Sequence, residues 1–162
     1  MVIVVMGPAG AGKSTVGHVL ADRLGWRFED ADDRHTPANV ARMAAGIPLT
    51  EADRAGWLDA LHGLVARAID RRESTVLACS ALKAHHRSRI AKGLHPVRFV
   101  YLKTPPGVLR ERLRSRRGHF ASEPLLDGQL ATLEEPGDEA LTVDGAADVN
   151  TIVGRIRLEL GV

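Results

Sequence analysis

The stretch MGPAGAGKST, residues 6–15, lies between an apolar run at residues 2–5 and a helical pattern of apolar residues that begins at Val16. Gly7 is followed by four residues and then by Gly12-Lys13-Ser14, which is the spacing of a phosphate-binding loop. Glycines leave room for successive backbone N–H groups and a helix N-terminus to converge on one anion. The stretch therefore predicts a nucleoside triphosphate site rather than a glycine-rich turn with a solvated lysine. It does not identify the phosphate acceptor.

Individual residues of this loop have different predicted roles. Lys13 adds a mobile positive charge for the outer phosphates, and Ser14 offers its hydroxyl to Mg²⁺. The loop as a whole is predicted to bind the nucleotide through Gly7, Pro8, Ala9, Gly10, Ala11, Gly12, Lys13, Ser14 and Thr15.

Strand and helix patterns alternate along the chain. Short β-rich runs at residues 2–6, 75–79 and 97–102 are each followed by a longer helical pattern. Residues 141–144 precede a last helical pattern, and residues 26–29 are a fifth candidate strand. Nearly continuous apolar strands that alternate with helices predict an α/β fold, with three α/β/α layers around a parallel sheet of about five strands.

The length of 162 residues fits a single domain, residues 1–162. In a parallel sheet, ligands bind beyond the carboxyl ends of the strands. The site is therefore expected at residues 7–14, 30–35, 80–87 and 144–147.

Two helices have clear signals of their own. Thr50 and Asp53 predict a capping box at the start of a helix that extends to about residue 70. The closing helix is predicted from apolar residues at helical spacing, which are Val149, Ile152, Val153, Ile156 and Leu160.

Composition limits the classes of protein. The net charge is +2, the pI is near 9.0, and aromatic residues make up only 4%, which leaves little stacking surface for nucleic acid. No apolar stretch approaches the roughly 20 residues that span a bilayer, and the N-terminus lacks the basic region of an export signal. The lone Cys79 is predicted to be a buried small hydrophobe, which suits a reducing cytosol. We therefore expect a cytoplasmic protein without a nucleic-acid or membrane partner.

The segment FEDADDRH, residues 28–35, brings acidic residues to the predicted site. Asp30 and Asp32 are two residues apart, so in an extended segment both carboxylates point toward the phosphate edge. A carboxylate there can accept a hydrogen bond from an attacking hydroxyl and help to hold the metal. Asp33 is interpreted as a solvated loop acid, and His35 as either a substrate contact or the end of the turn.

The segment CSALKAHHR, residues 79–87, leaves a central strand at the same edge. Arg87 lies one helical turn beyond Lys83, and a basic pair at this place can bind a carboxylate on a small substrate. The histidines are not expected to form a metal site, because His85 and His86 are adjacent and would project in different directions from a helix.

Five arginines fall within residues 110–117. Arg112 and Arg116 share one helical face and are predicted to clamp phosphate. The others are interpreted as a solvated face, namely Arg110, Arg114 and Arg117. Gly118-His119-Phe120 breaks the helix and predicts a hinge for a small lid, around residues 112–135, that closes over ATP and excludes water.

Taken together, these motifs resemble those of the small gluconate kinases, which are P-loop kinases related in fold to shikimate and adenylate kinases. The resemblance covers most of the chain in the same order. It is carried by DAD at 30–32 with His35 and Asn39, RMAAGIPLTEADRAGWL at 42–58, CSALKAHHR at 79–87, YLK at 101–103, RRGHF at 116–120 and QLATLEEP at 129–136. The chain departs from the family pattern in side chains only, at Ala9, Ala11, Ala31 and Thr36.

The resemblance implies transfer of the ATP γ-phosphate to the 6-hydroxyl of D-gluconate, with Mg²⁺, to give 6-phosphogluconate and ADP. The implied catalytic residues are Lys13, Asp30, Asp32 and Arg116. Either Asp30 or Asp32 orients the acceptor hydroxyl, while Ser14 and Asp30 hold the metal. The implied substrate-binding residues are Asp32, His35, Arg54, Lys83, Arg87, His119 and Gln129. Arg112 and Arg116 join the loop on the nucleotide side, and residues 144–147 border adenine.

Two other classes of protein remain open. A related small-molecule kinase, shikimate-like or nucleoside-monophosphate-like, would use the same loop with different acceptor contacts, and residues 42–58 and 79–87 argue against it. A nucleotide-binding or RNA-binding module would need a broad basic face, whereas Asp and Glu are interleaved through most of the chain. The oligomeric state is open as well, with a homodimer among the alternatives.

Overall fold

The computed structural model describes residues 1–115 and 123–162 and is built around a parallel sheet of five strands. The strand order is β2-β3-β1-β4-β5, and each pair of neighbours is parallel. The strands are β1 (Val2–Met6), β2 (Arg27–Asp30), β3 (Thr75–Cys79), β4 (Val97–Lys103) and β5 (Ala140–Asp144). The predicted sheet is confirmed, and the fifth candidate strand lies one residue later than residues 26–29.

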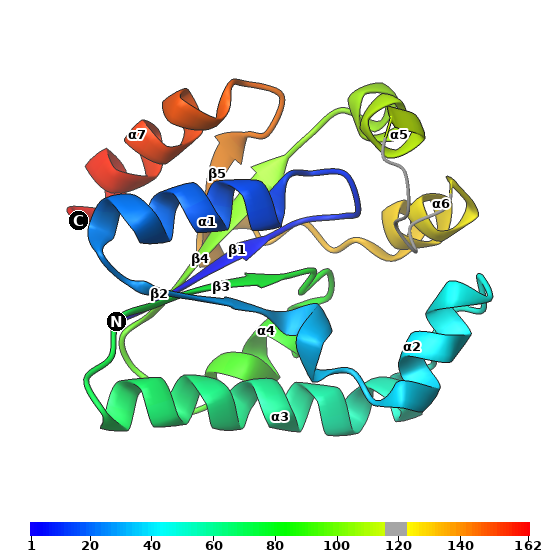
Figure 1. Ribbon diagram of the computed structural model, residues 1–162, viewed down its shortest axis with the longest axis horizontal. Helices are drawn as coiled ribbons and strands as arrows, with labels where there is room; N and C mark the ends of the chain where they lie inside the picture. Colours follow the sequence, from blue (N-terminus) through cyan, green and yellow to red (C-terminus); the bar gives the residue numbers. More distant parts are fainter. Residues whose placement is uncertain (116–122) are drawn as a thin grey trace.

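Helices cover both faces of this sheet, so the predicted three-layer architecture is confirmed as well (Figure 1). One face carries α1 (Lys13–Leu24) and α7 (Val149–Leu160), and the other carries α3 (Glu51–Asp70) and α4 (Ala84–Ala91). Three further helices lie beyond the end toward which β1 and β3 point (Figure 1), namely α2 (Pro37–Ala44), α5 (Pro106–Ser115) and α6 (Glu123–Thr132). Short 3₁₀ helices follow β2 and precede β5, at η1 (Ala31–Arg34) and η2 (Gly137–Glu139).

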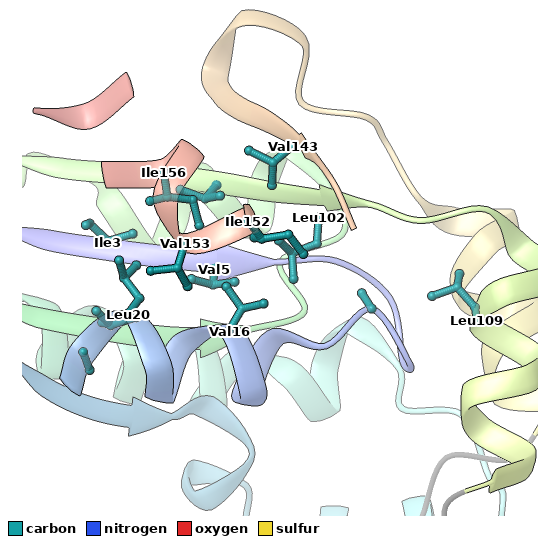
Figure 2. Packing of buried hydrophobic residues seen from close by; sticks show 14 of the residues in the cluster. Ile3, Val5, Val16, Leu20, Leu102, Leu109, Val143, Ile152, Val153 and Ile156 are labelled. Carbon is teal, nitrogen blue, oxygen red and sulfur yellow. The ribbon is translucent and has the colours of Figure 1, made fainter. Parts of the chain in front are cut away.

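The central strand β1 is buried at every position, which explains its uninterrupted apolar sequence. Because side chains alternate along a strand, β1 contributes to both layers of the core. Val2, Val4 and Met6 pack with the α3 side. Figure 2 shows the other layer, in which Ile3 and Val5 lie among apolar side chains of α1 and α7, namely Val16, Leu20, Ile152, Val153 and Ile156.

Local sequence signals behave as predicted at two positions. The capping box at the start of α3 is present, since the Asp53 N–H donates to Thr50 Oγ1 at 3.1 Å and the Thr50 N–H donates to Asp53 Oδ2 at 2.8 Å. Cys79 is buried at the end of β3. Among residues 1–115 and 123–162, no helix is long and apolar enough to cross a membrane.

Candidate active site

The phosphate-binding loop connects β1 to α1 in a backbone conformation that requires glycine. Gly10 and Gly12 have φ angles of 83° and 94°, and a Cβ on Gly10 would lie 2.9 Å from the carbonyl oxygen of Leu109. Residues with a side chain rarely adopt this left-handed backbone conformation, whereas glycine adopts it without steric cost. Gly12 is also the N-cap residue of α1, so the N-terminus of that helix opens at the loop. Lys13 Nζ donates to the carbonyl oxygen of Pro8 at 3.1 Å.

Asp30 joins this loop to the acidic segment that follows β2. Ser14 Oγ donates to Asp30 Oδ2 at 2.7 Å, and the Asp32 N–H donates to Asp30 Oδ1 at 3.0 Å. The second bond turns the chain into η1, so Asp32 lies in a 3₁₀ turn and not in the extended segment that the spacing argument assumed. Both carboxylates nevertheless line one cavity with the loop, which we call the phosphate end of the site. Its polar lining includes Lys13, Ser14, Asp30, Asp32 and His35.

Asp32 and His35 at the phosphate end have shifted pKa values. The walls of the cavity remove water from around the Asp32 carboxylate, and Asp30 repels its charge, so the pKa of Asp32 is raised. Burial lowers the pKa of His35, which leaves a neutral imidazole at pH 7. His35 Nδ1 is buried and has no hydrogen-bond partner within residues 1–115 and 123–162.

Trp57 of α3 fixes this acidic segment in place. Its Nε1–H donates to the carbonyl oxygen of Ala31 at 2.7 Å. Its ring stacks on His35, with 4.6 Å between ring centroids and 9° between planes. The sequence did not predict this contact, because a contact with a turn 26 residues earlier leaves no local signal.

A second cavity adjoins the phosphate end, and we call it the basic end. Arg54, Ser80 and Gln129 are among the residues that line both cavities, so the two form one cleft. Lys83 lines the basic end beside Glu51, and Lys83 Nζ donates to Glu51 Oε1 at 2.7 Å. The structure therefore brings two predicted substrate residues, Arg54 and Lys83, into the same cleft as Asp32 and His35.

Glu51 also draws the two adjacent histidines together. His85 Nε2 and His86 Nε2 lie 2.9 Å and 3.1 Å from Glu51 Oε2, so the prediction that these rings diverge is wrong. The three potential ligand atoms lie within 4.8 Å of one another. The same carboxylate also holds the Lys83 ammonium and lies 3.8 Å from an Arg54 nitrogen. These cations repel a metal ion, so the cluster is better described as an ion-pair network.

Glu51 and His86 are site residues that the sequence did not reveal. Glu51 is the first residue of α3, and His86 lies in the first turn of α4. The only local signal was the position of Glu51 beside the predicted cap residue Thr50. An acid at that position is already explained by the favourable interaction of negative charge with a helix N-terminus.

Arg87 does not reach the cleft, contrary to its predicted role as a substrate residue. Its side chain is only 4% exposed, and its Nε donates to Glu139 Oε2 at 2.9 Å. Its Nη1 donates to the carbonyl oxygen of Glu134 at 3.0 Å. The physical reason is the residue at which α4 begins. Lys83 is the N-cap residue and precedes the helix, so helical spacing does not bring Arg87 to the side on which Lys83 lines the cleft. Arg87 instead ties α4 to the segment after α6.

Gln129 of α6 and Arg112 of α5 contact the phosphate-binding loop. Gln129 Oε1 accepts a hydrogen bond from the Ala9 N–H at 2.7 Å. Arg112 Nη1 donates to the carbonyl oxygen of Gly145 at 2.9 Å and lies 3.4 Å from the carbonyl oxygens of Gly10 and Ala11. Arg112 and Gly145 also border a third cavity that flanks the loop.

Part of the predicted site lies outside the described residues. This applies to Arg116 and His119, and also to Arg117 and the predicted hinge at residues 118–120. Of the remaining arginines, Arg110 pairs with Asp127 and Arg114 pairs with Glu123 on the surface, as expected for a solvated face.

Comparison with known proteins shows the family of this chain. A family model described as an AAA domain matches residues 2–136. A gluconokinase from Gluconobacter oxydans is 47% identical over 137 residues, which cover 85% of this chain and 77% of that protein. The chain belongs to the gluconokinase family. The predicted resemblance is thereby confirmed, and membership of this family of P-loop kinases implies use of ATP.

Solved structures extend the gluconokinase similarity to the whole chain. A gluconokinase from Sinorhizobium meliloti is 38% identical with a TM-score of 0.84, over 98% of this chain and 94% of that one. A sugar kinase from Janibacter is 39% identical with a TM-score of 0.92, over 99% of this chain and 94% of that one.

Proposed function

We propose that this protein transfers the γ-phosphoryl group of ATP to the 6-hydroxyl of D-gluconate and so forms 6-phosphogluconate and ADP. The observation that carries the proposal is the continuous cleft with two chemically different ends. Lys13 and Asp32 lie at the phosphate end, Lys83 lies at the basic end, and Arg54 lines both. D-Gluconate has the matching form, with a primary hydroxyl at one end of its chain and a carboxylate at the other.

Asp32 is the residue that we assign to the acceptor hydroxyl. Asp30 is already engaged by the Ser14 hydroxyl and by the N–H of Asp32. The raised pKa of Asp32 makes it a stronger base than an ordinary aspartate. Asp32 would orient the 6-hydroxyl and accept the proton that it loses when its oxygen bonds to phosphorus.

Lys13 and the N–H groups of the loop are assigned to the negative charge of the phosphates. Such preorganised donors stabilise charge on the transferring phosphoryl group without reorganisation of solvent. Arg112 would act on the nucleotide side, where it lies beside Gly145 and the third cavity. That cavity is the proposed adenine site, in line with the prediction for residues 144–147. Arg116 remains a prediction for the transition-state charge.

Mg²⁺ fits the oxygen donors beside the loop. The Ser14 hydroxyl and the Asp30 carboxylate lie 2.7 Å apart, and hydroxyl and carboxylate oxygens are the ligands that Mg²⁺ prefers in proteins. We propose that these two residues hold the ion. When bound, the ion would supply positive charge to the phosphate oxygens.

Lys83 is the proposed partner of the gluconate carboxylate. Arg54 lines both ends of the cleft, His35 lines the phosphate end, and both would contact the hydroxyls of the sugar acid. Gln129 lines both ends and remains a candidate there. Arg87 is left out of the proposed site because it does not reach the cleft, and His119 remains a prediction from the sequence.

We further propose a single domain over residues 1–162 with a lid around residues 112–135, as the sequence predicts. A cytoplasmic location and the lack of nucleic-acid and membrane partners also remain predictions. A homodimer stays open as the oligomeric state.

The proposal is tested by measuring kcat/KM for gluconate, glucose and shikimate. Glucose has the same terminal hydroxyl without the charge, so gluconate should be favoured about 100-fold or more. Lys83→Ala should lower kcat/KM for gluconate about 10- to 100-fold and change that for glucose little. Arg89→Ala is the matched control, because Arg89 also lies on α4 but pairs with Asp59 away from the cleft.

Two results would contradict the proposal. Equal use of glucose and gluconate would show that the basic end does not recognise the substrate. A higher kcat/KM for shikimate would favour the alternative of a shikimate-like kinase on the same fold.

A further inference from the structure

The basic end of the cleft is organised around one carboxylate, Glu51. Its Oε1 accepts a hydrogen bond from Lys83 at 2.7 Å, and its Oε2 lies 3.1 Å from His86 Nε2. The Glu51 side chain is 47% exposed and lines the cavity rather than the core. The bond from Lys83 holds the pKa of Glu51 well below its usual range, so this carboxylate is ionised at neutral pH.

The charge of the basic end follows from the groups that line it. Within the described residues, its charged side chains are Glu51, Arg54 and Lys83. Burial lowers the pKa of His86, so this imidazole is neutral at pH 7. Two cations and one anion leave one net positive charge. A substrate with a single carboxylate neutralises that charge, whereas two carboxylates in the same place would overcompensate it.

We propose that Glu51 is a specificity-determining residue, which limits the basic end to one net positive charge and thereby selects acids with one carboxylate over acids with two. The inference rests on the proposed function, which places the substrate carboxylate at this end. Glu51 partly neutralises Lys83 and repels any second carboxylate that approaches it. Replacement of Glu51 by a neutral side chain leaves both cations available to a dianion.

Two small acids probe this charge directly. In both lactate and hydroxymalonate, a carboxylate is bonded to a carbon that carries a hydroxyl. The remaining substituent of that carbon is a methyl group in lactate and a second carboxylate in hydroxymalonate. Both are too short to extend to the phosphate end. Their dissociation constants are obtained from the rise in Tm with acid concentration, which needs no turnover. ADP and Mg²⁺ are present at saturating concentration, so that the acids do not bind at the phosphate-binding loop.

The quantity to compare among variants is the dissociation constant of hydroxymalonate divided by that of lactate. Wild-type protein should bind lactate at least as tightly as hydroxymalonate. Glu51→Gln should lower the ratio about tenfold, because the dianion gains more than the monoanion from the added positive charge. Lys83→Gln should raise the ratio, since it removes a positive charge. Asp59→Asn is the matched control, because it removes an ion-paired carboxylate from the same helix outside the lining of the cleft.

The outcomes separate this inference from the proposed function. An unchanged ratio in folded Glu51→Gln, or an equal shift in Asp59→Asn, would overturn the inference while wild-type phosphorylation of gluconate still stands. Failure of the wild type to phosphorylate gluconate would overturn the proposed function, whatever the ratio does. If Glu51→Gln does not fold, Lys83→Gln decides alone, and an unchanged ratio there overturns the inference.

Discussion

Asp30 and Asp32 are separated by one residue and have different surroundings. Asp30 ends β2 and accepts hydrogen bonds from Ser14 and from the N–H of Asp32. The Asp32 carboxylate lines the phosphate end together with Asp30, and desolvation and the charge of Asp30 raise its pKa. In the proposed function these surroundings would separate the roles of the two carboxylates, with Asp30 holding the metal and Asp32 accepting the proton.

Replacement of Asp32 by asparagine should reduce activity and stabilise the protein. A raised pKa means that the folded protein binds a proton to Asp32 more readily than the unfolded chain does, so ionisation of Asp32 destabilises the fold. The free energy of unfolding therefore decreases as pH rises from the unfolded to the folded pKa value of Asp32, and it stays lower above that interval. Asp32→Asn should therefore raise Tm at pH 7 and lower kcat about 100-fold or more.

The pH profile of the wild type provides the second measurement for Asp32. Because the ionised carboxylate is the active form, kcat/KM should fall as pH decreases, with a midpoint above the ordinary aspartate pKa of about 3.9. A midpoint at or below that value, or a lower Tm for Asp32→Asn at pH 7, would contradict the role given to this residue.

At the scale of elements, α5 presents arginines to two different environments. Arg110 and Arg114 form exposed ion pairs with Asp127 and Glu123 of α6. Arg112 instead contacts carbonyl oxygens of the phosphate-binding loop and of Gly145. Exposed ion pairs contribute little to stability, typically 0 to about 1 kcal/mol. Among these three, only Arg112 contacts the phosphate-binding loop.

Alanine substitutions along α5 should therefore have unequal effects. Arg112→Ala should raise KM for ATP or lower kcat by about tenfold or more, because it removes a positive charge beside the loop. Arg110→Ala and Arg114→Ala serve as controls and should stay within about twofold of wild type in the same assay. Equal losses in all three variants would indicate a diffuse basic surface instead.

Two helix glycines should respond in opposite ways to substitution by alanine. An added Cβ at Gly17 of α1 would lie 2.6 Å from the Phe28 ring, whereas at Gly154 of α7 it would meet nothing within 4 Å. Alanine is favoured over glycine inside a helix by about 1 kcal/mol. Gly154→Ala should raise the free energy of unfolding by up to about that amount, and Gly17→Ala should lower it. Denaturant unfolding measures both, and equal stabilisation would show that Phe28 moves without cost.

At the scale of the whole molecule, the cleft depends on segments that are far apart in the sequence. Arg87 connects the start of α4 to the carbonyl oxygen of Glu134 and to the carboxylate of Glu139. Glu134 Oε2 in turn accepts a hydrogen bond from the Ala84 N–H at 2.7 Å. These contacts hold Lys83, the N-cap residue of α4, at the wall of the basic end.

Cys79 offers a probe of the whole fold. Burial raises the pKa of its thiol to about 12, and only the thiolate reacts with iodoacetamide. At pH 8 the folded protein should react at least about 1000-fold more slowly than the chain in guanidinium chloride, and the rate should follow global unfolding. Mass spectrometry measures the modification. Complete alkylation of the folded protein within minutes would contradict the burial of β3.

The sequence by itself determined the architecture and the phosphate-binding loop, because both depend on local patterns. Apolar runs of strand length alternate with helical periodicity, and the spacing from Gly7 to Ser14 needs no tertiary partner to be recognised. The capping box of Thr50 and Asp53 is likewise a contact between neighbours in the sequence.

Only the tertiary structure decided which polar side chains share the cleft. Whether Arg87 faces substrate depends on the residue at which α4 begins, a boundary that periodicity does not define to within one position. Glu51 and Lys83 are 32 residues apart, and they meet only because α3 and α4 pack on the same face of the sheet. Asp32 turns into the cleft through a hydrogen bond to Asp30 that competes with strand extension. Contacts of this kind arise from packing between elements and leave no periodic signal in the sequence.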